Sequence, residues 1–130
     1  MKKIRKVIPM LASSPLYGMA KCGEFNGYIA IPHEIYVKIK SHQNWHEIPD
    51  IGVYPHGDWT YMKRYKDLAE SDNFIPLLDI RKVDTTNYYI IGFDTAHFGD
   101  DSNKWNAKTV REHTFELYDA MIKYIKNNSR

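Results

Sequence analysis

Two short polar stretches hold the residues of this chain that are best suited to chemistry. The first is Pro55–Thr60 (PHGDWT), and the second is Gly92–Asp101 (GFDTAHFGDD). Each contains a histidine and at least one aspartate, and each follows a run of apolar and β-branched residues. Because loops at strand ends can bring side chains of different strands into one cleft, we expect the two stretches to form a common site.

The second stretch carries possible proton carriers or metal ligands at three-residue spacing: Asp94, His97 and Asp100. Asp94 could hold the His97 imidazole in one tautomer, as an orienting carboxylate does in acid–base sites. The same three residues, joined by His56, could bind a divalent metal through imidazole and carboxylate ligands. A structural role, in which Asp94 caps the turn that follows it, is the alternative.

The charge around this stretch bears on the ligand. No Lys or Arg occurs between Lys82 and Lys104, whereas four aspartates do: Asp84, Asp94, Asp100 and Asp101. A bare phosphate would be repelled there unless a cation or a protonated histidine intervened. The stretch therefore suits a cation, a sugar hydroxyl, a base edge or a basic protein surface.

Aromatic and polar neighbours complete the candidate site. Tyr28, Tyr54 and Trp59 offer faces on which a nucleotide base could stack. The candidates for catalysis are His56, Asp94 and His97, and the candidates for ligand binding are Tyr28, Tyr54, Asp58, Trp59, Thr60 and Asp100.

The elements that must position these residues follow from hydropathy periods. A helix is predicted over Ala107–Lys126, with apolar residues at three- and four-residue steps and Asn106 as its N-cap. The segment His33–Lys40 has a strand period, although a short helix after Pro32 is also acceptable. Strands are predicted near the N-terminus at Val7–Leu11 and then over Phe25–Pro32, Asp50–Tyr54, Trp59–Lys63, Phe74–Val83 and Asn87–Asp94. Asp50–Tyr54 and Trp59–Lys63 are expected to form a hairpin around Pro55–Asp58. Asn87–Asp94 is expected to be the central strand. The class is α+β: a small, mainly antiparallel sheet with one long C-terminal helix packed on it.

Bulk properties exclude several classes of protein. The chain has 130 residues, which fits one domain over residues 1–130. A net charge of +2 is too balanced for a protein that coats long nucleic acid or a membrane surface, and no segment is apolar enough to span a bilayer. A single cysteine, Cys22, indicates a reducing compartment.

Three segments, in this order, resemble a family of small uncharacterised phage and prophage proteins: Gly27–His33 (GYIAIPH), Val53–Thr60 (VYPHGDWT) and Ile91–Asp100 (IGFDTAHFGD). The family pattern reads GYVAVP, then HGGxT, then GFDxAHxGD, followed by a terminal helix. Asp58 stands where the pattern has the second glycine of HGG, and Thr95 stands where it has a small residue or cysteine. The resemblance implies a phage-encoded accessory protein made in the cytoplasm of a host bacterium, with counter-defence as the expected role.

Three functions are compatible with these observations. The first is a His/Asp-lined cleft that binds a nucleotide-type signalling molecule or a host defence component. The second is a small hydrolase or phosphodiesterase, with or without a divalent metal, in which His97 acts as base and His56 with Asp58 acts as acid or metal ligand. The third is an inhibitor that docks its acidic loop on a partner protein. Sequence leaves the oligomeric state and the metal requirement open.

Overall fold

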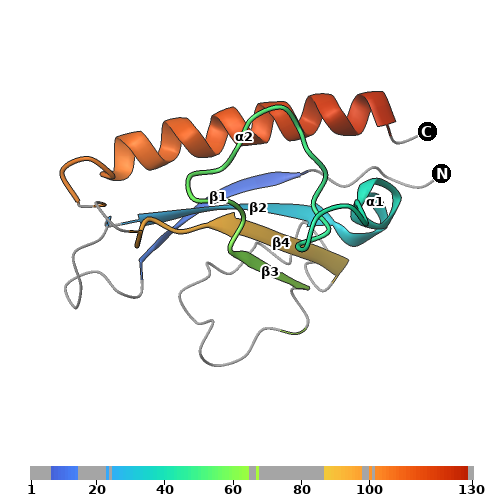
Figure 1. The fold of residues 1–130 in the computed structure, drawn as a ribbon, viewed down its shortest axis with the longest axis horizontal. Coiled ribbons are helices and arrows are strands. Elements are labelled where there is room, and N and C mark those ends of the chain that lie inside the picture. The colour runs from blue at the N-terminus through green and yellow to red at the C-terminus, as the bar shows by residue number, and fades with distance from the viewer. Residues whose placement is uncertain are drawn as a thin grey trace, which may run out of the picture.

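The structure, a computed structural model, describes residues 7–14, 23, 25–64, 67, 87–97, 100 and 102–128. In these residues the elements follow one another as β1 (Ile8–Ser13), β2 (Phe25–Pro32), α1 (His33–Ile39), β3 (Tyr61–Arg64), β4 (Tyr88–Phe93) and α2 (Ala107–Asn128). The strands form one antiparallel sheet in the order β1-β2-β4-β3, and α2 lies across one face of it (Figure 1). The predicted α+β class is confirmed.

The two most buried strands, β2 and β4, lie at the centre of the sheet. β2 pairs with β1 and β4, and β4 pairs with β2 and β3, so that Ile29 lies opposite Ile91. Successive side chains of a strand point to opposite faces, and each face is buried in its own cluster. The cluster shared with α2 takes Ile29, Ile31, Ile91 and Phe93, and the cluster on the other face takes Tyr28, Ala30, Tyr88 and Ile90. The prediction of a central strand over Asn87–Asp94 is confirmed.

The C-terminal helix forms where its apolar period predicts. Its buried side chains recur at steps of three and four residues: Val110, Thr114, Leu117, Met121 and Ile125. The Asn106 side chain accepts the N–H of Thr109 at 3.0 Å, which confirms the predicted N-cap. Neither helix of the described residues is long and apolar enough to cross a membrane.

The segment His33–Lys40 is helical despite its alternating pattern. Pro32 ends β2, and the helix that follows buries Tyr36 and Ile39, which lie three residues apart on one face. The ring of Tyr36 stacks 4.0 Å from the ring of Tyr89 at an angle of 15°. Packing of one face against the sheet therefore decided between the two predicted conformations.

The predicted hairpin of Asp50–Tyr54 and Trp59–Lys63 is wrong. The first of these segments forms no strand, and β3 pairs with β4 instead. Gly52 has a φ of +86°, and the Asp50 carboxylate accepts the Gly52 N–H at 2.9 Å. This local side-chain turn competes with extended pairing and replaces it. The predicted strand Phe74–Val83 lies outside the described residues.

The long connection between α1 and β3 brings polar residues to one end of the sheet. In Figure 1 it is the green segment that passes α2 before β3 begins. The backbone N–H of His56 donates to Nε2 of His113 on α2 at 3.0 Å, and the N–H of Thr60 donates to the carbonyl of Gly92 at 2.9 Å. These two bonds attach the connection to the helix and to β4.

Candidate functional site

A tight turn over Pro55–Asp58 presents His56. The N–H of Asp58 donates to the carbonyl of Pro55 at 2.9 Å, and Gly57 has a φ of +70°. The third position of a type II turn needs this left-handed backbone, which favours glycine. A Cβ atom on Gly57 would collide with the ring of His97. Glycine therefore also lets the two polar stretches approach each other.

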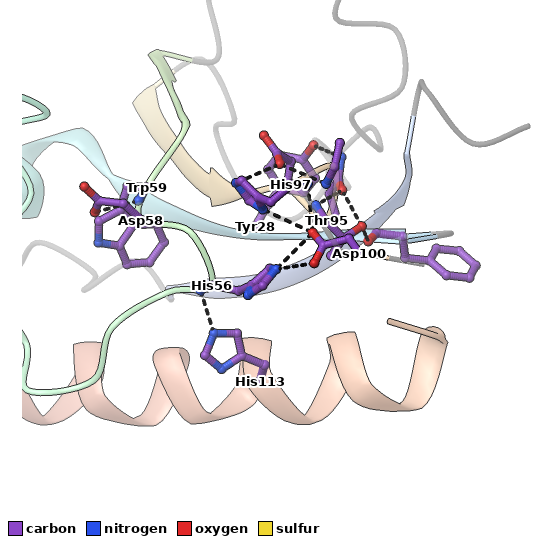
Figure 2. Close-up of polar contacts among 12 residues, drawn as sticks. Tyr28, His56, Asp58, Trp59, Thr95, His97, Asp100 and His113 are labelled. Atoms are coloured by element: carbon purple, nitrogen blue, oxygen red, sulfur yellow. Dashed lines mark hydrogen bonds and ion pairs between the residues drawn. The ribbon is translucent and has the colours of Figure 1, made fainter. Parts of the chain in front are cut away.

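His56 binds Asp100, which lies 44 positions further along the chain. Nε2 of His56 lies 2.9 and 3.0 Å from the two carboxylate oxygens of Asp100 (Figure 2). The ring of Trp105 lies 4.1 Å from the His56 ring, tilted by 31°. His56 is therefore held at three points: its ring face contacts Trp105, its Nε2 contacts Asp100, and its backbone N–H donates to His113.

His97 lies between two carboxylates. Its Nδ1 is 3.2 Å from Oδ2 of Asp100, and its Nε2 is 3.3 Å from Oδ1 of Asp94. Its ring stands edge-on to His56, with ring centroids 4.9 Å apart and planes at 86°. The predicted pairing of Asp94 with His97 is therefore present, with Asp100 on the second nitrogen.

Asp100 is the buried centre of the group, with 4% of its surface exposed. Burial acts to raise the pKa of its carboxyl, but hydrogen bonds from the His97 backbone N–H, at 2.9 Å, and from His56 outweigh that effect. The pKa of Asp100 therefore lies below its ordinary value. The group is a carboxylate near neutral pH, which is the form that a metal or an imidazolium requires.

The loop that carries these residues is tied to β2. The N–H of Thr95 donates to the side chain of Asn26 at 3.0 Å, and the Thr95 hydroxyl donates to the carbonyl of Phe25 at 2.9 Å. Both Thr95 and Asn26 are buried, so these bonds are shielded from water. They fix the start of the loop that leads to His97.

Two supporting residues were not predicted. His113 accepts the His56 N–H at Nε2, while its Nδ1 lies 3.0 Å from Glu116, three residues further along α2. This His–Glu spacing on a helix is a signal that the sequence contains. Trp105 has its Nε1 buried without a hydrogen-bond partner among the described residues, and its sequence position gives no such signal.

The other predicted residues lie away from this group. Tyr54, Asp58 and Trp59 line a pocket on the far side of the Pro55–Asp58 turn, and Figure 2 shows Asp58 and Trp59 pointing away from Asp100. Thr60 is exposed. Tyr28 is 3% exposed and packs edge-on against a tyrosine of β3, 5.5 Å between centroids, in the core of the sheet. The structure thus divides most of the predicted site between two places, and Tyr28 and Thr60 belong to neither.

The first part can hold a divalent cation. Ligand atoms of His56, His97 and Asp100 all lie within 4.8 Å of one another. Neighbouring ligands of a tetrahedral zinc ion lie roughly 3.3 Å apart, close to the nitrogen–oxygen distances of 2.9–3.2 Å between these side chains. The histidine side chains are 27% and 32% exposed, so one side of the group faces solvent. Without a metal, the same group is an imidazole oriented by a buried carboxylate, which is suited to proton transfer.

Comparison with protein-family models, with curated proteins and with solved structures finds no match to this chain. Its function is therefore argued from the geometry of the described residues.

Proposed function

We propose that this protein is a small hydrolase that depends on a divalent metal held by His56, His97 and Asp100. One observation carries the proposal: three ligand atoms of suitable type, from segments 44 positions apart, converge within 4.8 Å. Two imidazoles and one carboxylate form a common ligand set of catalytic zinc and of non-haem iron.

Hydrolysis is favoured over a purely structural metal site because the group is open on one side. Structural zinc sites are closed by four protein ligands, whereas catalytic sites keep a position for water. The partial exposure of both histidines leaves room for that water. A divalent ion held by His56, His97 and Asp100 would supply Lewis-acid activation of water for attack on an ester.

Asp94 would act as an orienting carboxylate behind the metal. It contacts Nε2 of His97, the nitrogen that faces away from Asp100. A carboxylate that accepts from the outer nitrogen of a metal-binding histidine fixes its tautomer and raises its basicity. His113 supports His56 in a related way, through the backbone rather than through the ring.

Charge indicates the substrate class. A divalent ion bound by Asp100 and two neutral imidazoles has a charge of about +1, and Asp94 behind His97 brings the whole group close to neutral, whereas the group without the ion has a charge of about −2. Without the ion, Asp94 and Asp100 would repel a phosphate. We therefore propose a phosphate ester or diester as the substrate.

Two other functions stay predictions. One is a phage-encoded counter-defence protein that sequesters a nucleotide-type signalling molecule or binds a host defence component, and the other is an inhibitor that docks its acidic loop on a partner protein. Both would leave turnover absent. The first would show nucleotide binding without hydrolysis, and the second would show a protein partner whose binding weakens with salt.

The test uses Co²⁺ as a spectroscopic probe and bis(p-nitrophenyl) phosphate as a substrate. The chelated protein should acquire the visible absorbance of four- or five-coordinate Co²⁺ and should hydrolyse the diester only when a divalent ion is restored. His56→Ala, His97→Ala and Asp100→Asn should each lose both properties. His42→Ala is the matched control, because the His42 side chain is 78% exposed and lies outside the group.

Two results would contradict the proposal. One is a wild-type protein that takes up no divalent ion, and the other is turnover that survives exhaustive chelation. Ion binding without hydrolysis of any ester would retain the metal site and remove the hydrolase.

A further inference from the structure

A second pocket lies behind the turn that carries His56, and nothing in the proposed hydrolase uses it. Its volume is about 220 Å³. Its walls combine aromatic side chains with carboxylates: Trp45, Tyr54, Trp59, Asp50 and Asp58. Drug-sized ligands occupy pockets of about 300–1,000 Å³, so this one suits a group the size of a single side chain.

Two of the aromatic walls are unusually exposed. Trp45 is 71% exposed and Tyr54 is 74% exposed, while Trp59 at the base is only 3% exposed. Each exposed ring is held by a carboxylate. Nε1 of Trp45 donates to Asp58 at 3.4 Å, and the hydroxyl of Tyr54 donates to Asp50 at 3.3 Å. Both exposed rings are therefore tied to carboxylates that also line the pocket, although the rings gain little from burial.

Asp58 is itself fixed in place. Its Oδ1 accepts the N–H of Trp59 at 2.8 Å and lies 3.2 Å from Nε2 of His46. Nδ1 of His46 accepts the N–H of Ile48 at 3.0 Å, which leaves the ring proton on the nitrogen that faces Asp58. Since His46 is only 9% exposed, it is a buried support and not a surface ligand.

Backbone conformation adds an independent observation. The non-glycine residues of the described chain that have positive φ are Glu47, at +59°, and Asp58, at +76°. Both belong to the connection that builds this pocket, and Asp58 lines it. Left-handed backbone outside glycine costs free energy and concentrates at ligand-binding positions. A glycine at position 58 would adopt this backbone without strain. Asp58 adopts it at a cost in free energy and presents its carboxylate to the Trp45 ring.

The charge and shape of the pocket point to a cation. Asp50 and Asp58 supply two negative charges, and none of the described lining residues is Lys or Arg. The faces of tryptophan and tyrosine attract cations through their ring quadrupoles, most strongly when several rings surround one charge. The two carboxylates would repel an anion such as a phosphate.

We propose that this pocket binds a small organic cation of the alkylammonium or guanidinium class. The cation would lie against the faces of Trp45 and Tyr54, with Asp50 and Asp58 balancing its charge. The proposal does not depend on the metal site. The Pro55–Asp58 turn separates the pocket from that site, and no residue that lines the pocket belongs to the group of His56, His97 and Asp100.

Nuclear magnetic resonance tests the proposal directly. In a ¹⁵N-labelled sample, the indole N–H of Trp45 is followed during titration with choline, with the neutral isostere 3,3-dimethylbutan-1-ol, and with N-acetyl-arginine amide. We expect saturable shifts at Trp45 with the cations and binding of the alcohol at least about tenfold weaker, because it lacks the charge. Tighter binding of the arginine derivative would identify a protein side chain as the source of the cation, and tighter binding of choline would identify a free metabolite.

Variants separate this site from general effects. Asp50→Asn and Tyr54→Leu should each weaken choline binding by about tenfold. Phe115→Leu is the matched control, because Phe115 is an aromatic residue 45% exposed on α2, away from the pocket. Asp50→Asn should keep Co²⁺ binding, and chelation should keep choline binding. Thermal unfolding and dispersed spectra establish that each variant is folded.

The proposal is overturned if the alcohol binds as tightly as choline, or if Trp45 does not respond to any of the cations. It is also overturned if both pocket variants bind choline as the wild type does.

Discussion

At the scale of single residues, two aspartates have different tasks around one imidazole. Asp100 is buried and contacts Nδ1 of His97, whereas Asp94 is partly exposed and contacts Nε2. A carboxylate that binds a metal must lose its hydration, which the buried position of Asp100 provides. A carboxylate that only orients a histidine can stay partly hydrated, as Asp94 does. The three-residue spacing in a single loop gives both aspartates access to the same ring.

Asp94→Asn tests this division. The amide can still accept a hydrogen bond but has lost the charge, so affinity for Co²⁺ should fall by about 10–100-fold while the ion still binds. Stability without metal should stay within about 0.5 kcal/mol, because the Asp94 side chain is 38% exposed. Calorimetric titration and urea unfolding measure the two effects, with Asp50→Asn as a carboxylate control outside the metal site. Equal Co²⁺ affinity in Asp94→Asn and wild type would refute the orienting role.

At the scale of elements, the Pro55–Asp58 turn separates the proposed metal site from the proposed cation pocket. Two of its residues, His56 and Gly57, lie against Asp100 and His97, while Pro55 and Asp58 line the aromatic pocket. A turn offers side chains to both sides without a helix or strand period, which allows a short segment to serve two surfaces.

Gly57→Ala should disturb this turn more than an equivalent change nearby. The alanine must adopt a φ of +70° and would also collide with the His97 ring, so we expect a loss of more than about 2 kcal/mol and weakened metal binding. Gly52→Ala is the matched control, because Gly52 has a φ of +86° but a Cβ atom there would meet nothing within 4 Å, so its loss should be about 1–2 kcal/mol. Urea midpoints of the two variants give the comparison. A Gly57→Ala protein that is as stable as Gly52→Ala would show that the contact with His97 is unimportant.

The packing of α1 on β4 predicts an alkaline limit to stability. Burial raises the pKa of Tyr36, and the adjoining Tyr89 raises it further, while burial also raises the pKa of Tyr89. The folded state therefore keeps both phenols neutral after the unfolded chain has begun to lose these protons, near a pH of about 10. Their contribution to stability is complete below that pH and declines as the pH rises above it.

The double variant Tyr36→Phe with Tyr89→Phe should lose this dependence. Between a pH of about 8 and about 11, its urea midpoint should fall less than that of the wild type. Tyr89→Phe alone keeps the hydrogen bond from the Tyr36 hydroxyl to the carbonyl of Glu47 and should lie in between. Identical slopes for all three proteins would mean that the two phenols titrate alike in the folded and unfolded states.

At the scale of the whole molecule, the group of His56, His97 and Asp100 joins parts of the chain that are distant in sequence. His56 belongs to the connection held against α2, and Asp100 belongs to the loop after β4 that is tied to β2. An ion bound at this group would therefore cross-link the helix layer and the sheet. Since the ligands converge only in the folded state, binding should stabilise the entire domain.

Thermal unfolding measures that cross-link. At a free ion concentration about 100 times the dissociation constant, the folded state gains about 2.7 kcal/mol, which raises Tm by roughly 10 °C in a domain of this size. Chelator should reverse the shift, and Asp100→Asn should abolish it. A Tm that is the same with Co²⁺, with Zn²⁺ and with chelator would exclude a metal site of useful affinity.

Much of the fold was predictable because it depends on local periodicity. The apolar runs within Phe25–Pro32 and Asn87–Asp94 were sufficient for the two central strands, and a period near 3.6 together with Asn106 was sufficient for α2. These patterns work because burial of the apolar side chains, on one face of α2 and on both faces of the central strands, selects the same conformation in almost any tertiary setting. The conformation of His33–Lys40 was ambiguous, because so short a segment satisfies either period until a packing partner chooses one.

The site was predictable only in its chemistry. Residue type and spacing determined that Asp94, His97 and Asp100 would share a loop, and they indicated His56 as a partner. Tertiary structure alone decided that His56 meets Asp100, while Asp58, two residues after His56, faces a different pocket. The physical reason is that a left-handed backbone at Gly57 and Asp58 reverses the direction of the chain, and contacts with α2 and the sheet fix that reversal from far along the sequence.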